Sequence, residues 1–336
     1  MDDHFHVPRG IFLLAILVGS VTGCAAEQTG SNAVTVDSAG VRIIENTVPL
    51  WRGGEEWIVD ESPVLDVGGD GESSPQLFRI EDIVGLGDKV AVINAASSQV
   101  FLFDMTGRLI KRIGGRGEGP GEFTRIRALD RCGEDTLVVT EQLRVSFFDA
   151  RGEFIRVQPI VGGHGNDFPR IAGIGAGCSS YAMFGNVTPP ASPGPTFRRS
   201  VTYFWGDLEG GPRDTIGTFS GQELVGATIE GYDQALYLPW GIDAVYTVGR
   251  GRFYIGTTDR PEVRVYRLTT GLESIIRWQS RPREVSAEDR RTYAEKKRWL
   301  LDHFPQGQEL VPELSELPRV PSFKPLFRSL LVDDEG

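Results

Sequence analysis

The chain has 336 residues, of which 40% are hydrophobic and 24% are charged, a composition typical of globular proteins rather than of disordered segments. The formal net charge is −11, and the longest basic run is the trio at 296–298, so the composition predicts no nucleic-acid partner. The 42 glycines and 20 prolines favour many turns and many short strands.

The N-terminal segment is typical of an export signal. Residues 11–21 (IFLLAILVGSV) form an apolar run that is too short to span a bilayer but suits the centre of a signal peptide. The run ends in VTGC (21–24), which resembles the bacterial lipobox. This resemblance implies cleavage before Cys24, acylation of its thiol and a mature chain anchored to a membrane. No Asp follows Cys24 closely, which by the same resemblance favours the outer membrane.

One feature departs from this pattern. The segment before the apolar run carries Asp2 and Asp3 against a single Arg9, whereas export signals begin with a basic region. An ordinary secreted chain, or a membrane anchor that stays uncut, remains the alternative.

A repeat of 45 residues begins at Phe78. Phe123 and Phe168 start the next two units at the same spacing, and the turn at 104–107 (DMTG) recurs at 149–152 (DARG). An Asp before a Gly-containing turn is typical of a hairpin. Repeats of this length indicate that one supersecondary unit is stacked several times.

Short runs of β-branched and aromatic residues predict about four antiparallel strands in each unit, including 90–93, 100–104, 108–113, 137–139, 145–149 and 153–160. Two looser units follow over 181–219 and 242–278, and a partial unit starts at Phe323. Two further strands are predicted at 40–47 and 56–67. Four-stranded units of this size predict a β-propeller with four full blades, in which the two N-terminal strands complete the last, partial blade and close the ring.

The stretch VFLFDMTGRLIKRIGGRGEGPGEF (100–123) resembles the bacterial six-bladed β-propeller lipoprotein family, which is related to NHL-repeat propellers. SAGVRIIENTVPLW (38–51) resembles the opening strands of that family. The resemblance implies a signal peptide at 1–23, a tether at 24–39 and a propeller of the six-bladed type at 40–336. Because the last blade of that family would continue beyond the final VDDEG, it also implies an incomplete C-terminal blade. A natural five-bladed or open form is the alternative.

The glycine-rich run at 114–123 (GGRGEGPGEF) does not fit a phosphate-binding loop. No register gives G-x-G-x-x-G, and the Lys of a P-loop is missing. The next segment, FTRIRAL, is a predicted strand rather than a helix. We therefore expect a turn between two blades.

Candidate catalytic residues are few. After signal cleavage only His164 and His303 remain, and no G-x-S-x-G motif occurs, so the sequence predicts no catalytic residue, no metal ligands and no cofactor. Cys132 and Cys178 lie 46 residues apart, close to one repeat, so a disulfide between adjacent blades is possible. Two free buried thiols are the alternative.

Candidate binding residues come from the start of each predicted inner strand. The positions in register are Ile80, Arg125 and Arg170, with Trp240 roughly matching. Arg125 and Arg170 at one channel mouth would form a rim that attracts anions, and Trp240 completes this candidate set. Exposed loop arginines that bind nothing are the alternative.

Residues 286–303 break the β pattern. Ser286 followed by Asp289 predicts a helix N-terminus, and acidic residues precede the basic trio as the helix dipole favours. We expect a helix inserted between blades that either caps the ring or presents a surface to a partner.

These features predict a non-enzymatic lipoprotein of the cell envelope, whose propeller is a binding or scaffold domain for an unknown protein or small molecule. The alternative is a hydrolase or lyase of the NHL type that acts at the propeller channel and uses a metal ion. That alternative follows from fold resemblance alone, since some related propellers are calcium-dependent lactonases or lyases. The loop DVGGDGESS (66–74) lacks the alternating acids of an EF-hand and is predicted to be a turn.

Overall fold

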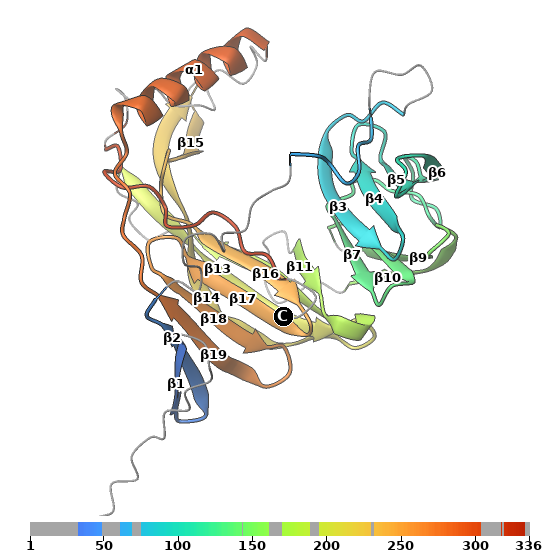
Figure 1. The fold of residues 1–336 in the computed structure, drawn as a ribbon, viewed down its shortest axis with the longest axis horizontal. Coiled ribbons are helices and arrows are strands. Elements are labelled where there is room, and N and C mark those ends of the chain that lie inside the picture. The colour runs from blue at the N-terminus through green and yellow to red at the C-terminus, as the bar shows by residue number, and fades with distance from the viewer. Residues whose placement is uncertain are drawn as a thin grey trace, which may run out of the picture.

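The computed structural model describes residues 33–48, 61–68, 75–142, 144–160, 170–188, 195–229, 232–303, 317 and 319–332. The predicted signal peptide (1–23), the acylation site Cys24, the predicted strand residues 56–60 and His164 lie outside these ranges. Within them the chain forms strands β1 to β19, one short 3-10 turn (Ala176–Cys178) and one α-helix, α1 (Figure 1).

The strands form four sheets in which chain neighbours pair antiparallel. The first sheet contains β3 (Ile80–Leu86), β4 (Lys89–Asn94), β5 (Gln99–Asp104) and β6 (Leu109–Gly114). The second contains β7 (Ala128–Cys132), β8 (Thr136–Thr140), β9 (Arg144–Asp149) and β10 (Phe154–Pro159). The third contains β11 (Arg170–Ile174), β12 (Ser180–Thr188), β13 (Thr196–Asp207), β14 (Gly211–Ile229) and β15 (Tyr232–Tyr237). The fourth contains β16 (Ala244–Gly249), β17 (Arg252–Thr257), β18 (Glu262–Arg267) and β19 (Gly271–Trp278), extended by β2 (Val41–Asn46) and β1 (Ala33–Ser38).

This architecture confirms the predicted fold class, an all-β propeller built from four-stranded blades with one helical insertion. The first strands of the four sheets, β3, β7, β11 and β16, lie next to one another in chain order and form the inner strands. In Figure 1 the sheets follow the chain along an arc, and the described parts of the first and last sheets do not adjoin.

The middle strands of the sheets are buried because they lie between neighbouring blades. Along β4, Ala91 and Ile93 face the core shared with the second sheet, whereas Val92 faces the opposite side together with Phe101 and Phe103. This two-residue alternation is the normal consequence of strand geometry. The core between the first two sheets contains Leu86, Ala91, Ile93, Val100, Leu102, Ile113, Phe123, Ile126, Leu129, Leu137, Val139 and Phe148.

The repeated Asp turns have the same geometry in both units. The Oδ1 atom of Asp104 accepts hydrogen bonds from the backbone N–H groups of Thr106 (3.0 Å) and Arg108 (3.1 Å). Asp149 accepts equivalent bonds from residues 151 and 153 at 2.9 and 2.8 Å. The sequence repeat therefore corresponds to a repeated hairpin between the third and fourth strands of a blade.

The glycine-rich run forms the predicted turn between blades. It starts at the end of β6, and the backbone N–H of Phe123 donates to the carbonyl of Gly115 at 2.8 Å. Gly114 has a φ of 81°, and a Cβ atom there would lie 2.2 Å from the ring of Phe123. Glycine is required at this position because the turn brings the backbone against a fully buried aromatic ring.

Both ends of the chain differ from the prediction. The N-terminal strands do not complete a blade around Phe323: β2 pairs in parallel with β19, with Ile43 opposite Ile275, and so extends the fourth sheet. β1 forms at 33–38, where the sequence predicts a tether, and residues 61–67 form no strand. The free edge of β19 explains this pairing, because an unpaired strand edge accepts any suitable β-branched segment.

The C-terminal segment 319–332 also forms no strand. Its Leu330 and Val332 instead pack on the outer face of the fourth sheet, against Tyr254, Val263 and Val265. The predicted partial blade is therefore absent from the described residues. This irregular segment, residues 319–332, is called the strap below. It covers the face of the fourth sheet on which a further blade would pack.

Helix α1 (Ala287–His303) begins at the predicted residue. The Oγ atom of Ser286 accepts the backbone N–H of Asp289 at 3.1 Å, and the Asp289 carboxylate accepts the backbone N–H of Ser286 at 2.9 Å. This reciprocal pair is a capping box. Lys324 of the strap and Ser286 hold the pKa of Asp289 at about 2. No helix in the described part of the chain is long and apolar enough to cross a membrane.

Two carboxylates join adjacent inner strands. Asp82 on β3 accepts the backbone N–H of Leu129 at 2.8 Å, and Asp130 on β7 accepts that of Ile174 at 3.0 Å. The two donors are 45 residues apart, so the contact repeats with the unit. Burial raises the pKa of Asp130 from its ordinary 3.8 to about 6.

We expect Asp130 to make stability depend on pH. Because its folded-state pKa is raised, its contribution is complete below about pH 4 and is lost as the pH rises through 6, a change of about 1–3 kcal/mol. Asp130→Asn keeps an acceptor for Ile174 without the charge. It should therefore flatten this dependence and be more stable than the parent chain at pH 7, as measured by urea unfolding at pH 4, 5, 6 and 7.

The exposed Asp135→Asn is the matched control and should leave the pH dependence unchanged. Asp130→Ala removes the acceptor and should be less stable than the Asn variant. An Asn variant with the same pH profile as the parent chain would show that Asp130 has no raised pKa.

Candidate functional site

The loop that carries Arg125 is fixed by one buried carboxylate. Glu141 is 4% exposed, and its Oε1 atom accepts the backbone N–H groups of Thr124 (2.8 Å) and Arg125 (3.1 Å). Arg144 pairs with the other oxygen of Glu141 and also donates to the carbonyl groups of Glu118 (3.1 Å) and residue 122 (2.9 Å). The exposed side chain of Arg125 therefore projects from a rigid backbone at the start of the second blade.

Arg127 lies two residues further along, just before β7. Its backbone N–H donates to the carbonyl of Thr140 at 2.8 Å, while its side chain is half-buried. The Nε atom of Arg127 is buried and has no hydrogen-bond partner within the described residues. A buried donor without an acceptor costs about 1–3 kcal/mol.

The charges around Arg127 add to this cost. Burial lowers the pKa of Arg127, and the like charges of Arg125 and Arg170 lower it further, opposed by Glu81. Arg170 is the first residue of β11, the inner strand of the third blade. The structure thus places Arg125 and Arg170, the two arginines predicted from the sequence, near Arg127, which was not predicted. The alternation R-I-R at 125–127, with buried Ile126 between two arginines, is the signal that could have found it.

Trp240 lies in a different place. It lines a cavity of about 290 Å³ between β14, β16 and the strap, with Asp243, Phe327 and Arg328 among its neighbours. Its backbone has a φ of 54°, uncommon for a bulky residue, and its ring packs on Tyr293 of α1 with centroids 5.6 Å apart. Trp240 therefore couples the helix to the fourth blade.

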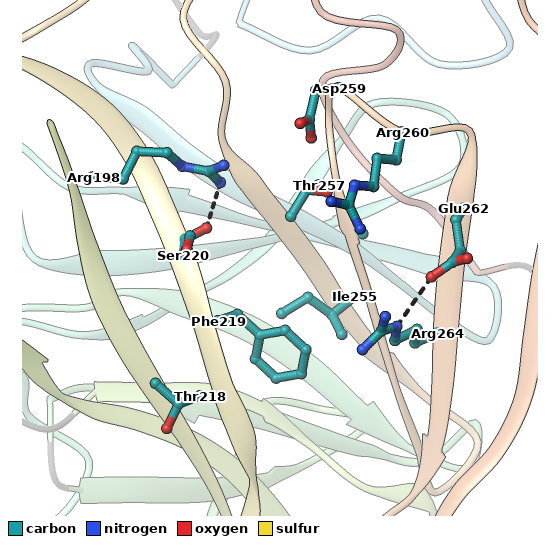
Figure 2. A pocket seen from close by; sticks show the side chains of 11 residues that line it. Arg198, Thr218, Phe219, Ser220, Ile255, Thr257, Asp259, Arg260, Glu262 and Arg264 are labelled. Carbon is teal, nitrogen blue, oxygen red and sulfur yellow. Dashed lines mark hydrogen bonds and ion pairs between the residues drawn. The ribbon is translucent and has the colours of Figure 1, made fainter. Parts of the chain in front are cut away.

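A second cavity, of about 240 Å³, lies between the third and fourth blades. Arg198 of β13 and Phe219 of β14 line one side, and residues of β17, β18 and the turn between them line the other (Figure 2). The sequence predicts none of these residues, because the cavity combines side chains from segments that are 35 or more positions apart in the chain.

Cys132 at the end of β7 and Cys178 in the turn after β11 form a disulfide in the structure, with Cα atoms 5.7 Å apart. The disulfide lies at the same junction as the hydrogen bond from Ile174 to Asp130, since both join the second blade to the third. Within the described residues, no group of three or more His, Cys, Asp or Glu side chains is placed to hold a metal ion.

Residues 72–159 match the model of the DUF5128 family, which is described as a 6-bladed beta-propeller. This match covers the first two sheets and supports a β-propeller family. No curated protein matches the sequence of the chain.

Among solved structures, the chain is similar to a Bacteroides fragilis protein described as exported, with 13% identity, 64% of this chain and 55% of that chain covered, and a TM-score of 0.38. It is also similar to a DUF4221 family member from Bacteroides vulgatus, with 15% identity, coverage of 60% and 58%, and a TM-score of 0.33. The chain thus spans somewhat more than half the length of these two proteins. At these TM-scores the similarities carry no argument about function.

The disulfide gives a direct test. Peptide mapping without reduction should recover the peptides of Cys132 and Cys178 as one linked species. Because the bridge closes a loop of about 46 residues, its reduction should lower the free energy of unfolding by about 2–4 kcal/mol. A Cys132→Ala, Cys178→Ala double variant is the control and should not respond to reductant. Alkylation of both thiols before reduction would favour the alternative of two free cysteines.

Proposed function

We propose that the chain is a lipid-anchored binding protein of the cell envelope, whose propeller binds an acidic ligand at the inner ends of its second and third blades. The binding groups are Arg125, Arg127 and Arg170. The observation that carries this proposal is the buried Nε atom of Arg127, which has no acceptor in the described residues while two like charges surround it.

A bound anion would compensate for the unfavourable surroundings of Arg127. A half-buried guanidinium is costly when one of its buried donors lacks an acceptor and two like charges outnumber the single opposing charge of Glu81. A carboxylate or phosphate bound among the three arginines would supply both, with charge-assisted hydrogen bonds that are roughly twice as strong as neutral ones. Glu141 and Arg144 hold the backbone of this site in place before the ligand arrives, which lowers the entropic cost of binding.

The export and anchoring parts of the proposal rest on the sequence at 11–24. A lipid on Cys24 would place the propeller at a membrane surface. The residues from Ala25 onward up to β1 would then separate it from that surface. The net charge of the full chain, −11, is strongly negative and keeps such a domain from binding generally to anionic lipids, so ligand recognition depends on the local arginine group.

The anion site predicts opposite effects on stability and on binding. Arg127→Met keeps the apolar stem but removes the charge and the buried donor. The ligand-free variant should therefore be as stable as the parent chain or more stable. Citrate and inorganic phosphate should raise the unfolding temperature of the parent chain. At 100 times the dissociation constant, the anion should add about 2.7 kcal/mol to the free energy of unfolding. The Arg127→Met variant should lose most of this stabilisation.

Sodium chloride at equal ionic strength is the control for screening, and the exposed Arg281→Met is the matched control for loss of one positive charge. The proposal is wrong if the anions stabilise the Arg127→Met chain as strongly as the parent chain, or if they stabilise neither.

The anchor predicts a covalent lipid on Cys24. When the chain is expressed in a Gram-negative host, it should fractionate with membranes, and its N-terminal peptide should carry the mass of an acylated cysteine. Cys24→Ser should abolish both, whereas Gly23→Ala, which keeps a small residue before the cysteine, should retain them. An N-terminal peptide that starts elsewhere and carries no lipid would support an ordinary secreted chain.

A further inference from the structure

The cavity between the third and fourth blades has an apolar floor and a polar rim. Phe219 of β14 and the buried Ile255 of β17 lie at its floor, whereas the guanidinium groups of Arg198 and Arg260 and the carboxylate of Asp259 face the open space above them (Figure 2). The volume of about 240 Å³ is smaller than that of cavities for drug-sized ligands. It therefore suits a small metabolite.

Some charges on the rim are already neutralised. Glu262 accepts a hydrogen bond from Arg264 at 3.0 Å and another from Arg277 at 2.8 Å. These residues form a closed network at one side of the cavity. They are not available to a ligand without breaking an existing ion pair.

The remaining charges lack such partners. Within the described residues, the side chains of Asp259 and Arg260 make no hydrogen bond or ion pair, and both are exposed in the turn between β17 and β18. Arg198 uses its Nε and one Nη atom on the carbonyl groups of Gly221 and Ser220, which fixes its plane, while its other Nη atom has no acceptor in the described part of the chain. Two guanidinium groups and one carboxylate therefore surround the same opening.

The charges on the rim influence one another. Burial lowers the pKa of Arg198, Arg260 lowers it further, and Asp259 is the leading carboxylate that opposes the change. A ligand that carried only a negative charge would be attracted by two arginines but repelled by Asp259. A ligand that carried only a positive charge would be attracted by Asp259 but repelled by the two arginines.

We propose that this cavity binds a free α-amino acid with an apolar side chain. The carboxylate of the amino acid lies between Arg198 and Arg260, its ammonium group faces Asp259, and its side chain packs on Phe219 and Ile255. This arrangement pairs every unpaired charge on the rim and fills the apolar floor. The site uses none of the residues of the proposed anion site, so either proposal can fail without the other.

The test compares three ligands of one shape by calorimetric titration of the purified full chain in detergent. L-Phenylalanine carries both charges, 3-phenylpropanoate lacks the ammonium group and phenethylamine lacks the carboxylate. We expect L-phenylalanine to bind at least tenfold more tightly than either analogue, because each lost charge leaves a charged group of the protein without its partner.

Two variants assign the charges. Asp259→Asn should weaken binding of L-phenylalanine about tenfold or more while leaving or improving the binding of 3-phenylpropanoate. Arg260→Gln should weaken both. The exposed Glu209→Gln and Arg281→Gln change the net charge equally and should alter neither affinity. Since Asp259 and Arg260 are exposed, their variants should unfold at the temperature of the parent chain, which a melting curve checks.

The proposal fails if no ligand binds at millimolar concentration or if 3-phenylpropanoate binds as tightly as L-phenylalanine. The second result would instead indicate a simple anion site. Equal affinity of the parent chain and the Asp259→Asn variant for L-phenylalanine would also overturn it.

Discussion

The arrangement of the blades depends on contacts between their inner strands, where a carboxylate of one strand accepts a backbone N–H of the next. Asp82 and Asp130 make this contact for the first three blades, and the disulfide from Cys132 reinforces the second junction. The inner strands also contribute apolar side chains to the cores between blades, such as Leu86 and Leu129, and the directional bond adds a fixed register to this packing. Burial raises the pKa of Asp130, so its charged form is costly there at neutral pH, and the hydrogen bond from Ile174 opposes this effect.

The faces at the two ends of the arc are covered in the same way. On the first sheet, Val67 and Leu77, from the segments before β3, pack on Phe101 and Phe103. On the fourth sheet, the strap covers Val263 and Val265. A blade that lacks a neighbour would expose this apolar surface to water, at about 25 cal/mol for each Å². In the described residues, irregular segments bury part of this surface at both ends of the arc.

The strands of the first two sheets and the helix could be predicted from the sequence because their signals are local: alternating apolar residues, repeated Asp turns and the pair Ser286 and Asp289. The pairing of β2 with β19 could not, since a strand edge more than 200 residues away leaves no local signal. The cavity lined by Arg198 and Arg260 could not be predicted either, because its two sides come from different blades. The candidate arginines Arg125 and Arg170 were predicted from the register of the repeat, which is a long-range signal. Arg127 lies two residues after Arg125 and so does not occupy the repeat position that was compared.

Carboxylates pair with several arginines of the fourth sheet. On the fourth sheet, Glu273 alone accepts hydrogen bonds from three arginines, Arg252 at 2.9 Å, Arg267 at 3.0 Å and Arg42 at 3.3 Å, and so joins β2 to β17, β18 and β19. With 46 acidic residues against 35 basic ones, acids are available to pair almost every cation. The arginines that have no acceptor in the described residues beside two blade junctions are therefore not explained by a shortage of carboxylates, and the two ligands proposed above would each supply such an acceptor.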